Sequence, residues 1–149
     1  MPNEYHNPTQ VGFSYYGLAL LDYLRGSHPD LAPDTDFINA RAQAAAETYS
    51  RVIRGGGSRI EAAQEADATL YRGLHFSLYD TLTHVIRSEF ADDIPEEDAR
   101  EAALILLPQA GEVARGYELS DDFADTPQYE QLYTELTGTV QILLGDGVQ

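Results

Sequence analysis

The hydrophobic pattern of the chain is most complete over residues 73–90, which read GLHFSLYDTLTHVIRSEF. On an α-helix of about 3.6 residues per turn, the apolar side chains of this stretch share one broad face. That face holds Leu78, Leu82, Val85 and Ile86, with Tyr79 and Phe90 at its flanks. The polar side chains fall opposite, at Ser77, Asp80, Thr81, His84, Arg87 and Ser88. The pattern therefore predicts a central helix that packs between two or more neighbours.

Two polar residues fall on the apolar side of this helix. His75 stands four residues before Tyr79, and Glu89 stands three residues after Ile86. A carboxylate that enters a core needs a partner, because an unpaired buried charge is strongly unfavourable. We expect Glu89 to meet an arginine, and Arg41 is the best candidate by its position at the edge of another apolar stripe.

Three helices are predicted ahead of the central one. The first covers residues 13–24 and ends near residue 26, before the break at residues 28–29. The second runs from residue 34 or 35 to residue 54 and ends at three consecutive glycines. Ser58 and Glu61 match a capping box that opens the third. The apolar side chains expected to be buried on this third helix are Ile60, Ala63, Leu70, Tyr71 and Leu74.

Two further helices are predicted after the central one. Pro95 suits the first position of a helix whose first turn is acidic, and we expect Pro108 to kink or end that helix. A short segment then reaches residue 115, and residues 116–125 form an acidic loop. The last helix is expected to begin at residues 126–127 and to present apolar side chains as far as residue 143.

These elements predict an all-α fold, because no alternating strand pattern and no hairpin signal separates them. We expect a compact, single-domain orthogonal bundle of six or seven helices. Residues 1–10 are interpreted as a flexible N-terminal lead-in, and residues 11–145 as the helical domain. With 43% hydrophobic residues, the chain has enough apolar side chains for a folded core.

Charge narrows the possible partners. The chain carries 25 acidic residues against nine basic ones, for a net charge of −16, and every basic residue is an arginine. The lack of lysine excludes Schiff-base chemistry and a phosphate-binding P-loop lysine. Direct nucleic-acid binding is not expected, because it needs a basic face. An acidic surface instead favours solubility or a basic partner.

Much of the acidic charge lies where helices are expected to begin. Carboxylates at a helix N-terminus accept backbone hydrogen bonds and interact favourably with the helix dipole. Capping is therefore the leading interpretation of the acidic clusters. Two alternatives stay open: a face that meets a basic protein, or a DNA-mimicking decoy with carboxylates at the phosphate spacing of a duplex. The acidic residues concerned are Asp34, Asp36, Glu96, Glu97, Asp98, Asp121, Asp122 and Asp125.

A candidate polar pocket is predicted around His75. Asp67, Tyr71 and His75 would lie one above another if the third helix continued through Gly73, although that glycine also fits a break. Such a group could support acid–base chemistry or bind a small ligand. A hydrogen-bonded core histidine is the competing interpretation. The predicted pocket consists of Asp67, Tyr71, His75, Tyr79, Glu89 and Arg41.

No motif specifies a cofactor or a metal. The chain contains no cysteine, no zinc-protease HExxH, no GxSxG and no GxGxxG. The aspartates at residues 30–36 lack the glycine and glutamate of a calcium loop. No apolar run is long enough to span a membrane, so we expect a cytoplasmic protein without cofactor, metal or membrane contact.

Four strings resemble a known family. They are SYYGLALLDYLR at 14–25, HPDLAPDTDFINARAQAAAETY at 28–49, GLHFSLYDTLTHVIRSEFADDIP at 73–95 and SDDFADTPQYEQLYTELTG at 120–138. With them the chain resembles the domain of unknown function 1896 family over residues 12–144. That family comprises small Bacteroidetes proteins often carried on conjugative mobile elements. The resemblance implies an all-helical, cytoplasmic bacterial protein, and it carries no activity or site residues.

A non-enzymatic protein-interaction or accessory role is the leading prediction for function, with a protein partner or a homo-oligomer. Tyr15, Tyr23 and Phe123 lie off the main apolar stripes and are expected to be exposed, which favours self-association. The alternatives are an enzyme or small-ligand binder built on the pocket around His75 and Glu89, and the DNA-mimic decoy.

Overall fold

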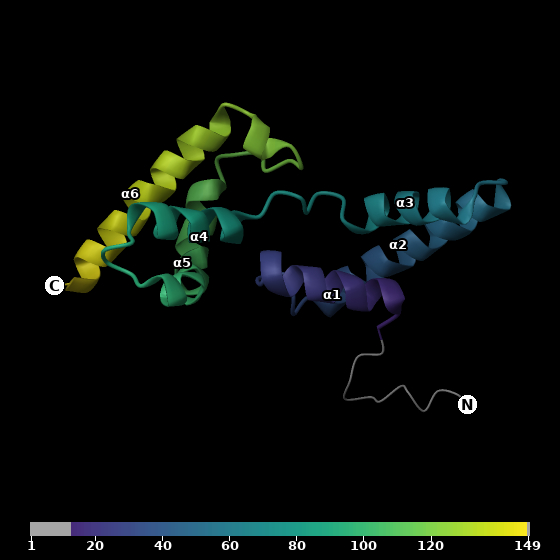
Figure 1. The fold of residues 1–149 in the computed structure, drawn as a ribbon, viewed down its shortest axis with the longest axis horizontal. Coiled ribbons are helices and arrows are strands. Elements are labelled where there is room, and N and C mark those ends of the chain that lie inside the picture. The colour runs from purple at the N-terminus through teal and green to yellow at the C-terminus, as the bar shows by residue number, and fades with distance from the viewer. Residues whose placement is uncertain (1–12, 149) are drawn as a thin grey trace. The chain divides into compact units, whose positions relative to one another are not determined.

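The structure is a computed structural model that describes residues 13–148. Within this range it contains six α-helices and no β-strand, so the predicted all-α class is confirmed (Figure 1). The predicted lead-in at residues 1–10 lies outside the described residues. The chain divides into two compact units, residues 1–72 and 73–149, and each is described by itself. The prediction of a single domain over residues 11–145 stays a prediction.

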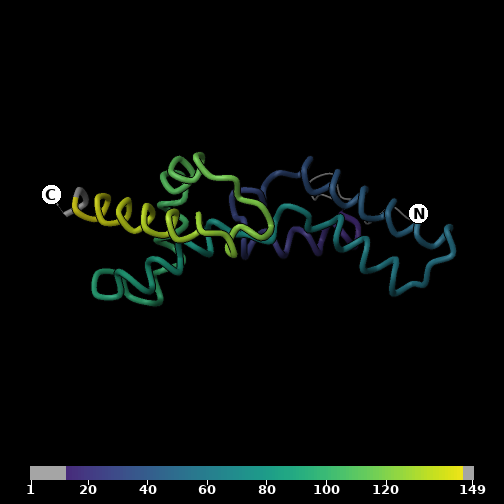
Figure 2. Tube along the Cα trace, turned by 90° about the horizontal axis from the view of Figure 1, so that it is seen from above, coloured from purple at the N-terminus to yellow at the C-terminus, as the bar shows by residue number. Residues whose placement is uncertain are grey.

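The first unit contains α1 (Tyr15–Ser27), α2 (Thr35–Arg54) and α3 (Arg59–Leu70). α2 packs against both α1 and α3, and Figures 1 and 2 show α2 and α3 side by side, joined by a tight turn. Alanines on the facing sides of these two helices permit their close approach, and the Thr48 and Thr69 hydroxyls meet across them at 3.1 Å. The buried apolar side chains of this unit are Leu20, Leu24, Ile38, Ala42, Ala45, Ala62, Ala66 and Leu70.

The buried face of α3 differs from the predicted one. Ile60 is 72% exposed and Ala63 is exposed, whereas Ala62 and Ala66 are fully buried. An alanine-rich helix has little contrast between its faces, so its small residues can pack into the close contact with α2 while the larger Ile60 faces solvent. The prediction that Ile60 and Ala63 belong to the core is therefore wrong.

The turn between α2 and α3 is fixed from both sides. After α2, the Gly57 N–H donates to the Val52 carbonyl and the Gly56 N–H to the Ile53 carbonyl, with Gly56 at a φ of 95°. This pattern is a Schellman motif. The predicted capping box then opens α3, because the Ser58 hydroxyl accepts from the Glu61 N–H while the Glu61 carboxylate accepts from the Ser58 N–H.

The second unit contains α4 (Leu78–Glu89), the short 3-10 helices η2 (Glu96–Asp98) and η3 (Phe123–Asp125), α5 (Ala99–Ala114) and α6 (Gln128–Val148). α4 packs against α5 and α6, as expected for the most amphipathic helix, and α5 also packs against α6. The predicted apolar face of α4 is confirmed, since Leu82, Val85 and Ile86 are fully or almost fully buried.

Two details of this unit correct the sequence analysis. Thr81, assigned to the polar face, is buried, because its hydroxyl donates to the Ser77 carbonyl and so enters the core with its hydrogen bond satisfied. Pro108 does not end α5, which continues to Ala114, and the expected kink stays a prediction. Pro108 itself is exposed, so the carbonyl that it leaves unpaired can be solvated.

Candidate functional site: an acidic groove in the second unit

The six residues of the predicted polar pocket are divided between the two units. Asp67, Tyr71 and Arg41 belong to the first unit, and His75, Tyr79 and Glu89 belong to the second. The pocket as a whole stays a prediction. The structure does define the surroundings of each member.

Asp67, Tyr71 and His75 do not share a helix. α3 ends at Leu70, and Gly73 has a φ of 80°, a conformation that suits glycine and breaks the helical course. Asp67 still lies close enough to Tyr71 for its negative charge to add to burial in raising the pKa of the Tyr71 phenol. Asp67 and Tyr71 are therefore close to each other, as expected for residues four positions apart. The predicted helical stack of Asp67, Tyr71 and His75 is not formed.

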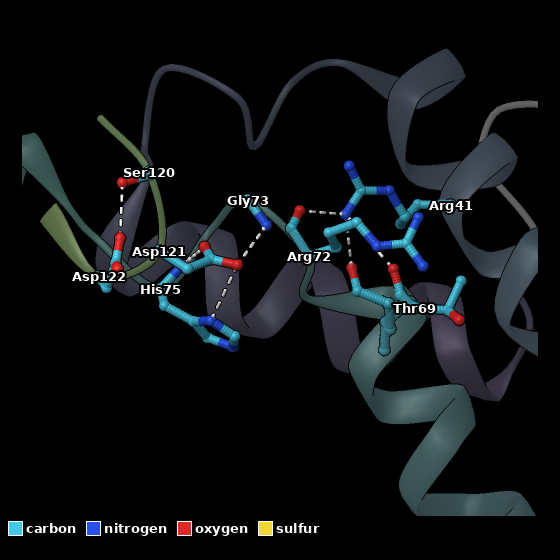
Figure 3. A network of polar contacts seen from close by, with 9 residues as sticks. Arg41, Thr69, Arg72, Gly73, His75, Ser120, Asp121 and Asp122 are labelled. Atoms are coloured by element: carbon cyan, nitrogen blue, oxygen red, sulfur yellow. Dashed lines mark hydrogen bonds and ion pairs between the residues drawn. The ribbon is translucent and has the colours of Figure 1, made fainter. Parts of the chain in front are cut away.

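Arg41 stabilises the C-terminal end of α3. One of its terminal nitrogens donates to the carbonyls of Leu70 at 3.0 Å and Arg72 at 2.7 Å, and at 3.5 Å to that of Thr69 (Figure 3). Thr69 and Leu70 are the last residues of α3 and Arg72 follows them, so the guanidinium lies at the C-terminal end of the helix, where a cation interacts favourably with the helix dipole. The guanidinium also lies over the Phe37 ring, 4.9 Å from its centroid.

Glu89 and Tyr79 have separate partners within the second unit. Glu89 is exposed, contrary to its predicted place on the buried side of α4, and it accepts a hydrogen bond of 3.0 Å from the Tyr133 hydroxyl. Because the carboxylate is solvated, it does not need the arginine that a core position would require. Tyr79 is buried and donates from its hydroxyl to the Arg100 carbonyl at 3.1 Å.

Asp121, which the sequence analysis treated only as a capping residue, is the partner of His75. One carboxylate oxygen accepts from the Gly73 N–H at 2.9 Å, and the other accepts from the His75 N–H at 3.0 Å (Figure 3). The same carboxylate lies 3.2 Å from Nδ1 of His75. The two backbone N–H groups are the main cause of the lowered pKa of Asp121. The His75 side chain is 56% exposed, so it is not the core histidine that was weighed against a catalytic role.

A concave surface of the second unit lies elsewhere. Three adjoining hollows, the largest of about 660 Å³, lie between the end of α5, the loop that follows it, and α6. Glu135 lines all three hollows, and they are called here the α5–α6 groove. Its apolar part includes Val113 and Ile142, and its polar part includes the glutamines of the first turn of α6.

Carboxylates dominate the charge of the α5–α6 groove. Glu118, Glu130 and Glu135 line it, and no arginine or histidine is among its lining residues. Near its centre the Tyr117 hydroxyl donates to Glu135 at 2.6 Å, and this hydrogen bond raises the pKa of the Tyr117 phenol. The Tyr117 ring meets buried Phe123 edge-on, with centroids 6.0 Å apart, so the groove rests on the core of its own unit.

This arrangement suits a ligand with both positive charge and apolar surface. Carboxylates accept charge-assisted hydrogen bonds from guanidinium or ammonium groups, while Val113 and 65%-exposed Ile142 offer aliphatic contact. Polyanions would be repelled. Sequence reasoning missed this site, because Tyr117 and Glu135 come from an acidic loop and from the polar face of a helix. Only the packing of α5 against α6 brings them together.

Two expectations about exposed aromatic residues are revised by the structure. Phe123, expected to be exposed, is 2% exposed and packs against Phe76 with centroids 4.9 Å apart. Tyr23 is half-buried and meets Tyr71 edge-on. Tyr15 is 79% exposed, as predicted. Of the three, Tyr15 alone keeps the exposure on which the prediction of self-association relied.

Residues 13–148 contain no helix with the length and hydrophobicity needed to span a bilayer. In the same range, no three or more histidine, aspartate or glutamate side chains are grouped so that they could hold a metal ion.

The fold and the groove define a small, acidic all-α protein with an open candidate binding surface. The chain belongs to the family described as "Domain of unknown function (DUF1896)", which it matches over residues 8–147. The family suggested by the sequence is thereby confirmed.

A solved structure supports the same assignment. The chain is 39% identical to protein PG0816 from Porphyromonas gingivalis, with a TM-score of 0.84 over 89% of this chain and 91% of that chain. None of the curated proteins matches this sequence.

Proposed function

We propose that this protein is a non-enzymatic interaction protein whose α5–α6 groove binds a segment of a partner protein. The segment combines arginine or lysine with branched aliphatic side chains. The observation that carries the proposal is the composition of the groove: three carboxylates and two accessible aliphatic side chains, without a basic residue among its lining.

The hydrogen bond between Tyr117 and Glu135 supports a binding role. It orients one carboxylate at the centre of the groove before a partner arrives, which reduces the conformational entropy lost on binding. The glutamines at residues 128 and 131 add donors and acceptors for the backbone of an extended segment. An open surface of this kind is typical of a transient interface with moderate affinity.

Selection from a random peptide display library tests the proposal. With the wild-type protein as bait, we expect enrichment of peptides that combine basic and aliphatic residues. The Glu118→Gln/Glu135→Gln variant keeps the size of both side chains and removes two charges, so the selected peptides should bind it at least about tenfold more weakly.

The matched control is Asp92→Gln/Glu97→Gln, which removes two exposed carboxylates outside the groove. Selected peptides should bind it as they bind the wild type. Enrichment of acidic or purely apolar peptides, or equal binding to the groove and control variants, would overturn the proposal.

A further inference from the structure

The α2–α3 turn in the first unit carries charge of the opposite sign to the rest of the chain. Arg51, Arg54 and Arg59 are three of the nine basic residues, and residues 51–60 contain no acidic residue. All three arginines are exposed. Arg54 and Arg59 form no ion pair with any residue of the part that the structure describes.

Exposed apolar side chains lie beside these arginines. Ile60, which was predicted to be buried, is 72% exposed, and Ile53 is 39% exposed. Arginine is enriched in protein interfaces and their hot spots, and the two exposed isoleucines add apolar surface beside it. The name hairpin tip is used below for Ile53, Arg54, Arg59 and Ile60.

The backbone presents the hairpin tip in a fixed conformation. A Schellman motif closes α2 and a capping box opens α3, so each residue of the three-glycine turn is set by hydrogen bonds or by the left-handed conformation of Gly56. Gly57 also lies so close to Val52 that a Cβ atom there would come within 2.5 Å of its side chain. A preorganised tip loses little backbone entropy when it docks.

From this chemistry we infer that the hairpin tip of one copy of the chain docks into the α5–α6 groove of a second copy. The tip offers guanidinium groups and isoleucine side chains, and the groove offers Glu118, Glu130 and Glu135 beside Val113 and Ile142. The two surfaces are therefore complementary in charge and in apolar character. This inference rests on the proposed function of the groove and names its occupant as a second copy.

Each docking contact joins two different surfaces, the hairpin tip of one copy and the groove of the other. A contact between two hairpin tips would bring like charges together, and a contact between two grooves would do the same. A contact between a tip and a groove has a property that can be tested by mixing. A copy without a working tip still has a groove, and a copy without a working groove still has a tip.

The experiment uses three full-length proteins in analytical ultracentrifugation at low ionic strength. They are the wild type, the tip variant Arg54→Glu/Arg59→Glu, and the groove variant Glu118→Arg/Glu135→Arg. We expect the wild type to self-associate, and each variant alone to associate at least about tenfold more weakly. An equimolar mixture of the two variants should associate again, because the intact tip of one variant meets the intact groove of the other and the two reversed surfaces are again opposite in charge.

Two controls separate specific docking from changes in net charge. Arg25→Glu/Arg72→Glu changes the net charge as much as the tip variant but alters exposed arginines outside the tip, so it should associate as the wild type does. Raising the ionic strength from about 0.1 M to about 1 M shortens the Debye length from about 10 Å to about 3 Å and should weaken the complex.

Association of either variant alone at the wild-type level would overturn the inference, as would a mixture that stays monomeric or a wild type that stays monomeric at the highest accessible concentration. These outcomes differ from failure of the proposed function. If peptide selection identifies basic, apolar ligands for the groove but the wild type remains monomeric, the groove binds a different protein and only the second copy is excluded as its occupant.

Discussion

At the scale of single residues, the carboxylates of this protein have several different local roles. Asp34 accepts from the Phe37 N–H at the start of α2, and Glu61 completes the capping box of α3. Asp34 confirms the capping interpretation for its own helix, whereas Asp98 and Asp122 occupy the N-cap positions of α5 and η3 without a side-chain cap hydrogen bond. Asp121 departs from this interpretation, because its carboxylate binds the backbone of residues 73 and 75, far away in the sequence.

Asp121→Asn is expected to lower the free energy of unfolding by about 1 kcal/mol near neutral pH, since it removes the charge and one hydrogen-bond acceptor at a partly exposed site. The pKa of Asp121 is lowered in the folded state. Its contribution is therefore present above the unfolded-state pKa of about 3.9 and is lost as the pH falls through the folded-state pKa.

Urea unfolding of Asp121→Asn and its parent between neutral and acidic pH measures this effect. Both proteins carry His75→Gln, so that the imidazole does not titrate. Asp122→Asn is the control, because Asp122 accepts from the nearby Ser120 hydroxyl in an exposed position. A difference in unfolding free energy that grows as the pH falls would contradict the assignment.

In the groove, the Tyr117 phenol reports on Glu135. The hydrogen bond to Glu135 raises the Tyr117 pKa, so Glu135→Gln should lower it toward the ordinary value of about 10. NMR of ring-labelled tyrosine as a function of pH measures the change. Glu89→Gln, which alters the partner of Tyr133, should leave the Tyr117 pKa unchanged. An unchanged Tyr117 pKa in Glu135→Gln would show that the two side chains do not interact.

At the scale of helices, Arg41 shows how a side chain predicted to pair with a carboxylate can instead cap a helix. Arg41→Ala leaves the last carbonyls of α3 without this donor and is expected to destabilise the first unit by about 1–2 kcal/mol. Amide hydrogen exchange should accelerate in the last turn of α3. Arg54→Ala, at an exposed position without an ion pair, is the control and should change exchange there little. Unchanged protection of α3 in Arg41→Ala would refute the capping role.

The turn between α2 and α3 depends on one left-handed residue. Gly56 has a φ of 95°, whereas Gly55 has a φ of −82°. Gly56→Ala is expected to cost about 1–2 kcal/mol in unfolding free energy, because a Cβ atom disfavours the left-handed conformation. Gly55→Ala should be close to neutral. Thermal unfolding of the two variants gives the comparison, and equal effects would contradict the Schellman geometry.

The helices could be predicted because their signals are local. The spacing of apolar residues predicted the buried face of α4, and the pair Ser58 and Glu61 predicted the start of α3. The faces of α3 could not be assigned, because alanines differ little from their neighbours in hydrophobicity. The alanine-rich sequence therefore did not predict that Ile60 is exposed. A large apolar side chain that faces solvent gains little from packing, which is a reason to look for a function at that position.

At the scale of the whole molecule, the site could not be predicted because its residues converge only through packing. Glu135 and Tyr117 are 18 residues apart and meet because α5 packs against α6. The predicted polar pocket was based on helical spacing along residues 67–89 with Arg41 added as a partner, and its members lie in two units. The sequence does identify one unusual segment. In a chain with a net charge of −16, residues 51–60 contain three arginines and no acidic residue.

The most direct test of the groove is amide chemical-shift mapping of the ¹⁵N-labelled full chain with the strongest peptide from the display selection. We predict that the largest shifts cluster at residues 113–120 and 128–142. The amides of α1, which lies outside both the groove and the hairpin tip, provide the internal control and should shift little. Shifts concentrated in the first unit, or the absence of shifts at saturating peptide, would contradict the claim that this groove is the binding site of the protein.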